Sequence, residues 1–163
     1  MKKDLWDSLY ITEEDVVVPL LEELNNSVYV YIKPNIESRY GFTKSGKFNK
    51  KGLYLIYKDD MLLYVGMSTG YIQTRISRFF AAARGTDRFD ESHPAGEKYR
   101  KIYNDFDNIT IKTVDFDFNS LPQIITVENV EEELIYRLKP LLNVKGNKSR
   151  FCGNAVLKLK ESI

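Results

Sequence analysis

The chain has few of the residues that build disulfides and soft-metal sites. Its 163 residues include one cysteine, Cys152, and one histidine, His93. A lone cysteine excludes an intrachain disulfide and a multi-cysteine zinc site, and a lone histidine excludes a histidine-rich metal centre. Any metal that this chain binds would therefore be held mainly by oxygen ligands, which favours magnesium, manganese or calcium.

Long hydrophobic runs are also missing. No apolar stretch approaches the ~20 residues that a membrane-spanning helix needs. The start of the chain, from Met1 to Asp7, is basic and then acidic, with no apolar segment behind it. We therefore expect no signal peptide, no membrane partner and a cytoplasmic protein. Hydrophobic residues make up 43% of the sequence, enough to bury the core of one domain with a small appendage.

The charge is small overall but unevenly distributed. The net charge is +1, yet residues 26–101 carry 14 basic and 7 acidic groups, and residues 134–163 carry 7 and 1. If the two basic blocks meet in the fold, they form a local patch that suits phosphate groups. The alternative is that these charges are simply solvated.

Hydrophobic periodicity predicts a mixed chain of helices and strands. We expect helices over residues 12–26, 71–84, 97–103 and 122–138, and strands over residues 28–32, 53–57, 62–65 and 109–118. The two middle strands read as a hairpin around Lys58, Asp59 and Asp60, where we expect Lys58 to be solvated. A three-residue loop there would place Tyr54 directly opposite Tyr64 on one face, whereas a two-residue loop would put them on opposite faces.

Two charged residues lie on or beside the apolar stripes of predicted helices. Glu131 falls inside a stripe formed by Val127, Val130, Leu134, Ile135 and Leu138. A carboxylate among core-facing positions is costly unless it has a partner or a metal, although it could also reach solvent at the edge. Arg75 borders the stripe of the helix over residues 71–84, where a planar guanidinium suits phosphate binding. Alternatively, its stem covers apolar surface.

These residues, in this order, resemble the GIY-YIG nuclease superfamily over about residues 50–145. The two motifs that name the superfamily appear as Gly52-Leu53-Tyr54 and Tyr64-Val65-Gly66, and Arg75 follows on the next helix. Glu131 opens the pattern that continues with Leu134-Ile135 and ends with Pro140 and Asn143. The resemblance is strongest to stand-alone type II restriction endonucleases. It implies an α/β fold of the α+β type, with a small central three-stranded antiparallel sheet flanked by helices, here with an N-terminal helix–strand extension.

The resemblance also implies a chemistry. The chain would be a magnesium-dependent endonuclease, with manganese as a substitute, that hydrolyses phosphodiester bonds of double-stranded DNA. Glu131 would hold the metal, and Tyr54 would act as general base or position the water. Tyr64 would orient the nucleophile or the phosphate, Arg75 would clamp the scissile phosphate, and Asn143 would brace the site.

The sequence departs from the superfamily at one important position. Many members carry a histidine or tyrosine four residues after the arginine, whereas this chain has Phe79, which cannot relay a proton. His93 is the candidate replacement, arriving from a loop, although it could equally have no role. If Phe79 marks lost chemistry, the chain is an inactive DNA-binding module. A phage or repair endonuclease of the same superfamily is a further alternative.

We expect three segments and a broad DNA contact. Residues 1–50 form an extension that contacts DNA or a second subunit, residues 51–145 form the catalytic core, and residues 146–163 form a basic tail. One site cuts one strand, so duplex cleavage predicts a homodimer or a larger assembly. The predicted DNA-contacting side chains are Lys44, Lys47, Lys50, Lys51, Arg78, Arg84, Lys145, Lys148 and Arg150.

Overall fold

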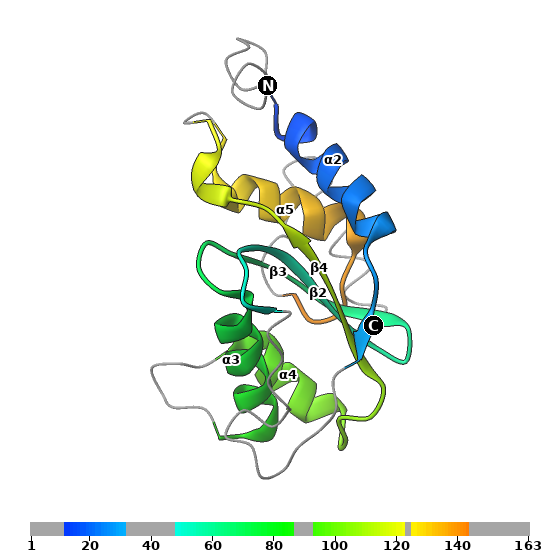
Figure 1. The fold of residues 1–163 in the computed structure, drawn as a ribbon. Coiled ribbons are helices and arrows are strands. Elements are labelled where there is room, and N and C mark those ends of the chain that lie inside the picture. Colours follow the sequence, from blue (N-terminus) through cyan, green and yellow to red (C-terminus); the bar gives the residue numbers. More distant parts are fainter. Residues whose placement is uncertain (1–11, 32–47, 87–92, 123–124, 144–163) are drawn as a thin grey trace, which may run out of the picture.

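A computed structural model of the chain describes residues 12–31, 48–86, 93–122 and 125–143. The elements follow in the order α2 (Glu13–Asn26), β1 (Val30–Tyr31), β2 (Gly52–Lys58), β3 (Met61–Ser68), α3 (Ile72–Arg84), α4 (Pro94–Ile102), β4 (Ile109–Asp115), the short 3₁₀ helix η2 (Phe118–Ser120) and α5 (Val127–Leu138). Figure 1 shows the sheet between two helical layers, with α2 and α5 on one face and α3 and α4 on the other.

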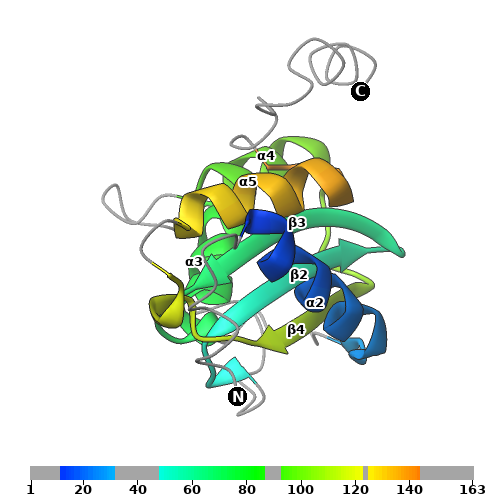
Figure 2. The same cartoon turned by 90° about the horizontal axis from the view of Figure 1, so that it is seen from above.

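The sheet is antiparallel throughout, with the strand order β1-β4-β2-β3. Strand β1 pairs only two residues with β4, so β4, β2 and β3 form the body of the sheet. The predicted class, a small three-stranded antiparallel sheet flanked by helices, is confirmed. The N-terminal helix and strand occur as α2 and β1, and the apolar side of α2 lies in the same core as β2 and α5. Figure 2 shows α2 and α5 crossing over this face of the sheet.

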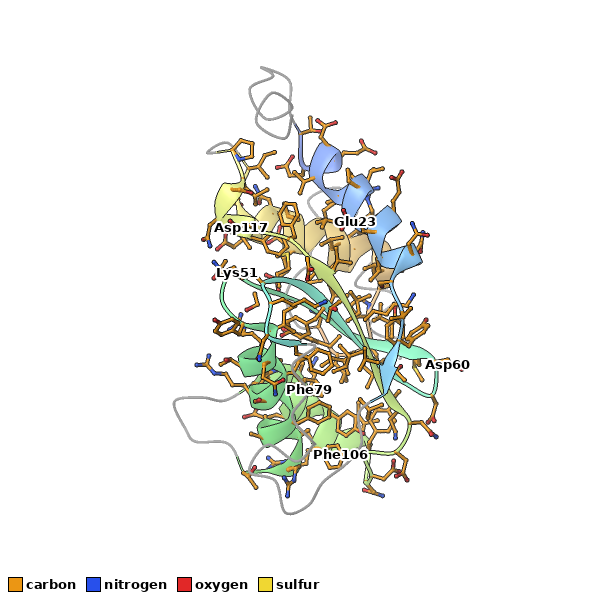
Figure 3. All side chains as sticks on the ribbon, viewed as in Figure 1. Glu23, Lys51, Asp60, Phe79, Phe106 and Asp117 are labelled. Atoms are coloured by element: carbon orange, nitrogen blue, oxygen red, sulfur yellow. The ribbon has the colours of Figure 1, made fainter. Side chains whose placement is uncertain are left out.

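The central strand β2 supplies both cores, because alternate side chains of a strand point to opposite faces. Leu53 and Leu55 pack with α2 and α5, whereas Tyr54 and Ile56 pack with α3 and α4. None of these four side chains is more than 1% exposed. The second layer is rich in aromatic rings, and Figure 3 shows Phe79 and Phe106 between the sheet and the helices α3 and α4.

The hairpin between β2 and β3 turns on two residues, Asp59 and Asp60. Both have positive φ, 49° and 66°, which is the backbone of a type I′ turn. Lys58, on the strand side of this turn, is only 4% exposed, and its Nζ lies 2.6 Å from Asp105 Oδ1 and 2.7 Å from the carbonyl oxygen of Asp107. The expectation that Lys58 is solvated is therefore wrong, because the loop before β4 folds back and covers it.

The register of the hairpin differs from both arrangements predicted from loop length, Tyr54 directly opposite Tyr64 or the two tyrosines on opposite faces. The pairing passes from Tyr57↔Leu62 to Ile56↔Tyr64, so Leu63 is an extra residue on β3 and forms a bulge. The bulge shifts the register by one residue and returns Tyr64 to the face of Tyr54, despite the two-residue loop. Tyr54 itself lies opposite Gly66, not opposite Tyr64.

Each of the two motif glycines is required by a different close contact. Gly52 has φ +142°, and a Cβ there would lie 2.0 Å from the carbonyl oxygen of Val114 on the neighbouring strand. A Cβ at Gly66 would lie 2.3 Å from Cζ of Tyr54, so the tyrosine ring fills the space above this glycine. Each motif therefore needs a glycine in order to let another group approach the backbone closely.

Two helices begin elsewhere than predicted, because their caps decide the starts. Helix α4 begins at Pro94, three residues before the expected start, since proline suits the first helical position and His93 caps it. Helix α5 begins at Val127 and not at 122, because Thr126 accepts a hydrogen bond from the backbone N–H of Asn129 at 3.1 Å.

Residues 141–143 line the outer edge of β3. The backbone N–H of Leu141 donates to the carbonyl of Leu62 at 3.2 Å, and that of Leu142 donates to the carbonyl of Leu63 at 2.8 Å. The edge strand is therefore covered exactly where many sheets leave backbone groups open. Within the described ranges, no helix has the length and apolar character needed to cross a membrane.

The contact between Gly66 and Tyr54 predicts a difference between two glycines of the same region. Gly66→Ala should lower the free energy of unfolding by about 1–3 kcal/mol, because the new methyl group overlaps a fully buried ring. Gly70→Ala is the matched control. A Cβ at Gly70 would meet no atom within 4 Å, so this variant should stay within about 0.5 kcal/mol of the wild type. Urea denaturation measures both. Equal stability of the two variants would contradict the packing described here.

Candidate active site

A pocket of about 480 Å³ lies at the end of the sheet where β3 leads into α3 and α5 begins. Figures 1 and 2 both show these three segments at the same end of the molecule. Its size is in the range of small-ligand sites. The residues that line it are Met67, Ser68, Thr69, Gly70, Tyr71, Thr74, Arg75, Val127, Glu128 and Glu131.

Arg75 and Glu131 line this pocket from opposite helical layers. Arg75 is exposed on the second turn of α3, and Glu131 is half-buried on α5. They reach the same space because the end of β3, whose Met67 and Ser68 also line the pocket, runs between the two layers (Figure 1). Arg75 and Glu131, which the sequence places on or beside apolar stripes, therefore line one pocket although their helices lie on opposite faces of the sheet.

The two motif tyrosines form a hydrogen-bonded pair beneath this region. Their ring centroids are 5.9 Å apart. The two phenols are hydrogen-bonded to each other. Tyr54 is 1% exposed, whereas Tyr64 is half-buried.

The electrostatics of the tyrosines link them to the pocket residues. Burial raises the pKa of Tyr54 well above its usual value, and the neighbouring Tyr64 raises it further. Burial also raises the pKa of Tyr64, and the carboxylate of Glu131 adds to this shift. The guanidinium of Arg75 opposes the shift at both phenols. Four of the predicted site residues therefore act on one another, but Tyr54 is held as a neutral phenol.

His93 also lies beside this group. Its ring centroid is 5.0 Å from that of Tyr64 and 5.4 Å from that of Phe79. As the cap of α4, its Nδ1 accepts a hydrogen bond from the backbone N–H of Gly96 at 3.4 Å. Burial, followed by the charges of Arg75 and Arg78, lowers the pKa of His93 to about 4. At neutral pH the imidazole is therefore uncharged and carries its proton on Nε2, so it can donate a hydrogen bond from that atom.

Asn143 contacts the sheet and not the pocket. Its side chain is buried, Oδ1 accepts from the backbone N–H of Val65 at 2.9 Å, and Nδ2 donates to the carbonyl of Val65 at 2.8 Å. This pair of hydrogen bonds fixes β3 between Tyr64 and Gly66. The geometry is that of the bracing role that the resemblance implies.

Of the predicted DNA-contacting residues, the structure places four. Lys51 and Arg78 are exposed, and Arg84 is half-buried at the end of α3. Nζ of Lys50 lies 3.3 Å from Oδ1 of Asp115, an ion pair at the surface. Figure 3 shows Lys51 near Asp117, at the end of the sheet opposite the turn at Asp60. The other five, Lys44, Lys47, Lys145, Lys148 and Arg150, lie outside the described residues.

Of the pocket residues, sequence reasoning predicted only Arg75 and Glu131; among those it missed, Glu128 and Tyr71 bear most on function. Glu128 precedes Glu131 by three positions, and residues at this spacing share one face of a helix, which was a usable signal. Tyr71 lines the opposite wall. It precedes a helix at a cap position, where sequence patterns give no sign of which way an aromatic ring points.

The donors around the pocket fit a hard divalent cation. Carboxylates of Glu128 and Glu131 and hydroxyls of Ser68, Thr69 and Thr74 line it, and all are oxygen donors. In the part of the chain that the structure describes, no group of three or more histidine, cysteine, aspartate or glutamate residues could hold a metal. Mg²⁺ differs from other metals in needing only one or two carboxylates, because waters and substrate phosphates complete its shell. Glu131 and Glu128 would therefore hold it.

No protein family, no curated protein and no solved structure matches this chain. The chemistry of the pocket and its neighbours is therefore the basis for assigning a function.

The buried position of His93 predicts a pH dependence of stability. The folded chain holds this pKa at about 4, below the usual 6.5 of an unfolded chain. The contribution of the neutral His93 ring to the free energy of unfolding is therefore complete above pH 6.5. It is lost as the pH falls toward 4, by up to about 3 kcal/mol. His93→Asn keeps a cap acceptor but removes the titration, so its stability should fall less over this range.

The same shift is directly measurable, because His93 is the only histidine. The imidazole resonances in an NMR titration of untagged protein should move with a midpoint near 4. A midpoint close to 6.5 would show that the ring is solvated and does not pack on Tyr64.

Proposed function

We propose that the protein is a divalent-metal-dependent DNA endonuclease that hydrolyses phosphodiester bonds. One observation carries the proposal: Arg75 and Glu131, from opposite helical layers, line a single pocket and both act electrostatically on the Tyr54–Tyr64 pair. A cation for a phosphate, a carboxylate for a metal and phenols for a water are the groups that phosphodiester hydrolysis needs. The two tyrosine motifs of the sequence supply the same residues.

The charged residues have separate roles in this proposal, phosphate binding and metal binding. The guanidinium of Arg75 binds the oxygens of the scissile phosphate and offsets the negative charge that builds up in the transition state. Glu131, with Glu128 beside it on α5, provides carboxylates for Mg²⁺ or Mn²⁺. When bound, such an ion supplies a Lewis acid next to the phosphate. The basic groups exposed at Lys51 and Arg78 extend the contact along the DNA backbone.

Of the two roles that the resemblance gives Tyr54, positioning suits its surroundings better than general base. A phenol that is 1% exposed, with a pKa raised well above its usual value, does not give up its proton readily near neutral pH. Tyr54 instead keeps its proton and, through its hydrogen bond with Tyr64, fixes the direction of that phenol. Tyr64 then orients the attacking water or the phosphate, and the ring of His93 packs edge-on against that of Tyr64.

The specific type that we propose is a sequence-specific restriction-like enzyme of the cytoplasm that acts on double-stranded DNA. The support is the closeness of the motifs to those of the stand-alone type II members. Since one site cuts one strand at a time, cleavage of a duplex favours a homodimer or a larger assembly.

A second candidate, a DNA-binding module without catalysis, is favoured by two particular observations. Phe79 occupies a fully buried position in the aromatic layer and offers no proton relay. Tyr54, moreover, is held neutral by its burial. The two candidates differ in a simple assay with plasmid and phage DNA in magnesium. Discrete fragments support the enzyme, whereas intact DNA with a shifted band in a binding gel supports the module.

The metal assignment predicts a contrast between neighbouring glutamates. Glu131→Gln should lower the cleavage rate in magnesium by about 100-fold or more, because it removes the charged metal ligand while DNA binding stays measurable. Glu132→Gln, one residue along the same helix and outside the pocket lining, is the matched control and should cleave at the wild-type rate. If Glu131→Gln also cleaves at that rate, Glu131 does not hold the metal.

The tyrosine pair predicts unequal losses. Tyr64→Phe should lower the cleavage rate by about 100-fold, because it removes the phenol to which we assign orientation of the water or the phosphate. Tyr54→Phe should cost only about tenfold, with an unchanged pH–rate profile, because it removes a positioning hydrogen bond. A larger loss in Tyr54→Phe than in Tyr64→Phe, together with loss of the limb in which the rate rises with pH, would instead make Tyr54 the general base.

A further inference from the structure

One aromatic residue of the pocket has no explanation in the fold. Tyr71 is 62% exposed, and its side chain lines the pocket together with Thr74 and Arg75. It occupies the N-cap of α3 but makes no capping hydrogen bond with its side chain. Serine, threonine, aspartate and asparagine stabilise that position by about 1 kcal/mol more than residues that cannot cap. The tyrosine therefore serves neither the helix nor the core.

Tyr29, another exposed tyrosine, is held in place by contacts with its neighbours. Tyr29 is 53% exposed, but its ring packs edge-on against Tyr57 at 5.1 Å, and Nζ of Lys112 lies 4.3 Å from its centroid. The ring of Tyr71 contacts no other aromatic ring among the residues that the structure describes. One tyrosine is held by its neighbours, and the other presents its ring to the pocket.

The surface next to Tyr71 is open. A Cβ built on Gly70 would meet no atom within 4 Å, so the turn before α3 is open. Arg75 lines the same pocket from the second turn of α3. An exposed aromatic ring and a guanidinium are therefore available to one ligand in this pocket.

We infer that Tyr71 is a stacking platform for a nucleobase next to the phosphate that Arg75 binds. This inference rests on the proposed function, since it names what accompanies the phosphate in that pocket. A stacked pair inside a duplex has no free face, so the base that Tyr71 receives must be unpaired or displaced from its helix. Stacking on an aromatic ring tolerates every base, because each has a π face. Tyr71 therefore secures the strand at the site without reading its sequence.

The test separates base stacking from backbone binding. Binding is measured by fluorescence anisotropy in a Glu131→Gln background, with a labelled single-stranded oligonucleotide and with an abasic oligonucleotide of the same length. Tyr71→Ala should weaken binding of the base-bearing oligonucleotide about tenfold, whereas Tyr71→Trp and Tyr71→Phe keep it within about twofold. The abasic oligonucleotide should bind all variants equally. Tyr29→Ala is the control for an exposed tyrosine outside the pocket and should bind like the parent.

Two results would overturn the inference: unchanged binding in Tyr71→Ala, or an equal loss for the abasic and base-bearing oligonucleotides. No binding of either oligonucleotide by the parent would overturn it as well. The measurement needs no cleavage, so its outcome is independent of the nuclease assay. A wild-type chain that leaves DNA intact but shows the stacking pattern would refute the endonuclease and retain the platform, and the reverse result would refute only the platform.

Discussion

The arrangement of the site depends on one extra residue in β3. The bulge at Leu63 shifts the hairpin register by one position and so turns Tyr64 toward Tyr54. In a sheet, a shift by one residue moves every following side chain to the other face. The carbonyl of Leu63 is satisfied from outside the hairpin, by the backbone N–H of Leu142. Two residues further along β3, Asn143 holds both backbone groups of Val65. The segment after α5 therefore stabilises the register on which the tyrosine pair depends.

With this register, burial decreases across the candidate site from Tyr54 through Tyr64 to Arg75. Tyr54 is enclosed above Gly66, Tyr64 is half-buried, and Arg75 is exposed at the pocket. The enclosed phenol keeps its proton, whereas Tyr64 and Arg75 lie nearer solvent. The helical layers contribute opposite charges, α3 the guanidinium and α5 the carboxylate. Such an arrangement suits a phosphate that enters from the end of the sheet between the two layers.

His93 shows how a fold can bring a polar ring beside a buried apolar one. The superfamily resemblance points to a missing histidine or tyrosine at Phe79, on α3. The cap of α4 carries His93 to within 5.4 Å of the Phe79 ring and 5.0 Å of the Tyr64 ring, measured between centroids. Its Nδ1 is engaged by the first turn of its own helix, which leaves Nε2 as the donor. The same fold hides Lys58, because a chain segment 47 residues away covers it.

The three-stranded antiparallel sheet was predicted from the resemblance, whereas local periodicity was enough to predict most of the helices and strands, and the position of Glu131 inside and Arg75 beside apolar stripes. These properties depend on residues a few positions apart, and short-range spacing is visible in a sequence. Only the tertiary structure decided the bulge at Leu63, the enclosure of Tyr54, and the meeting of Tyr71 and Glu128 in one pocket. Each of these depends on backbone pairing and packing between segments that are distant along the chain, and no pattern of neighbouring residues encodes such contacts.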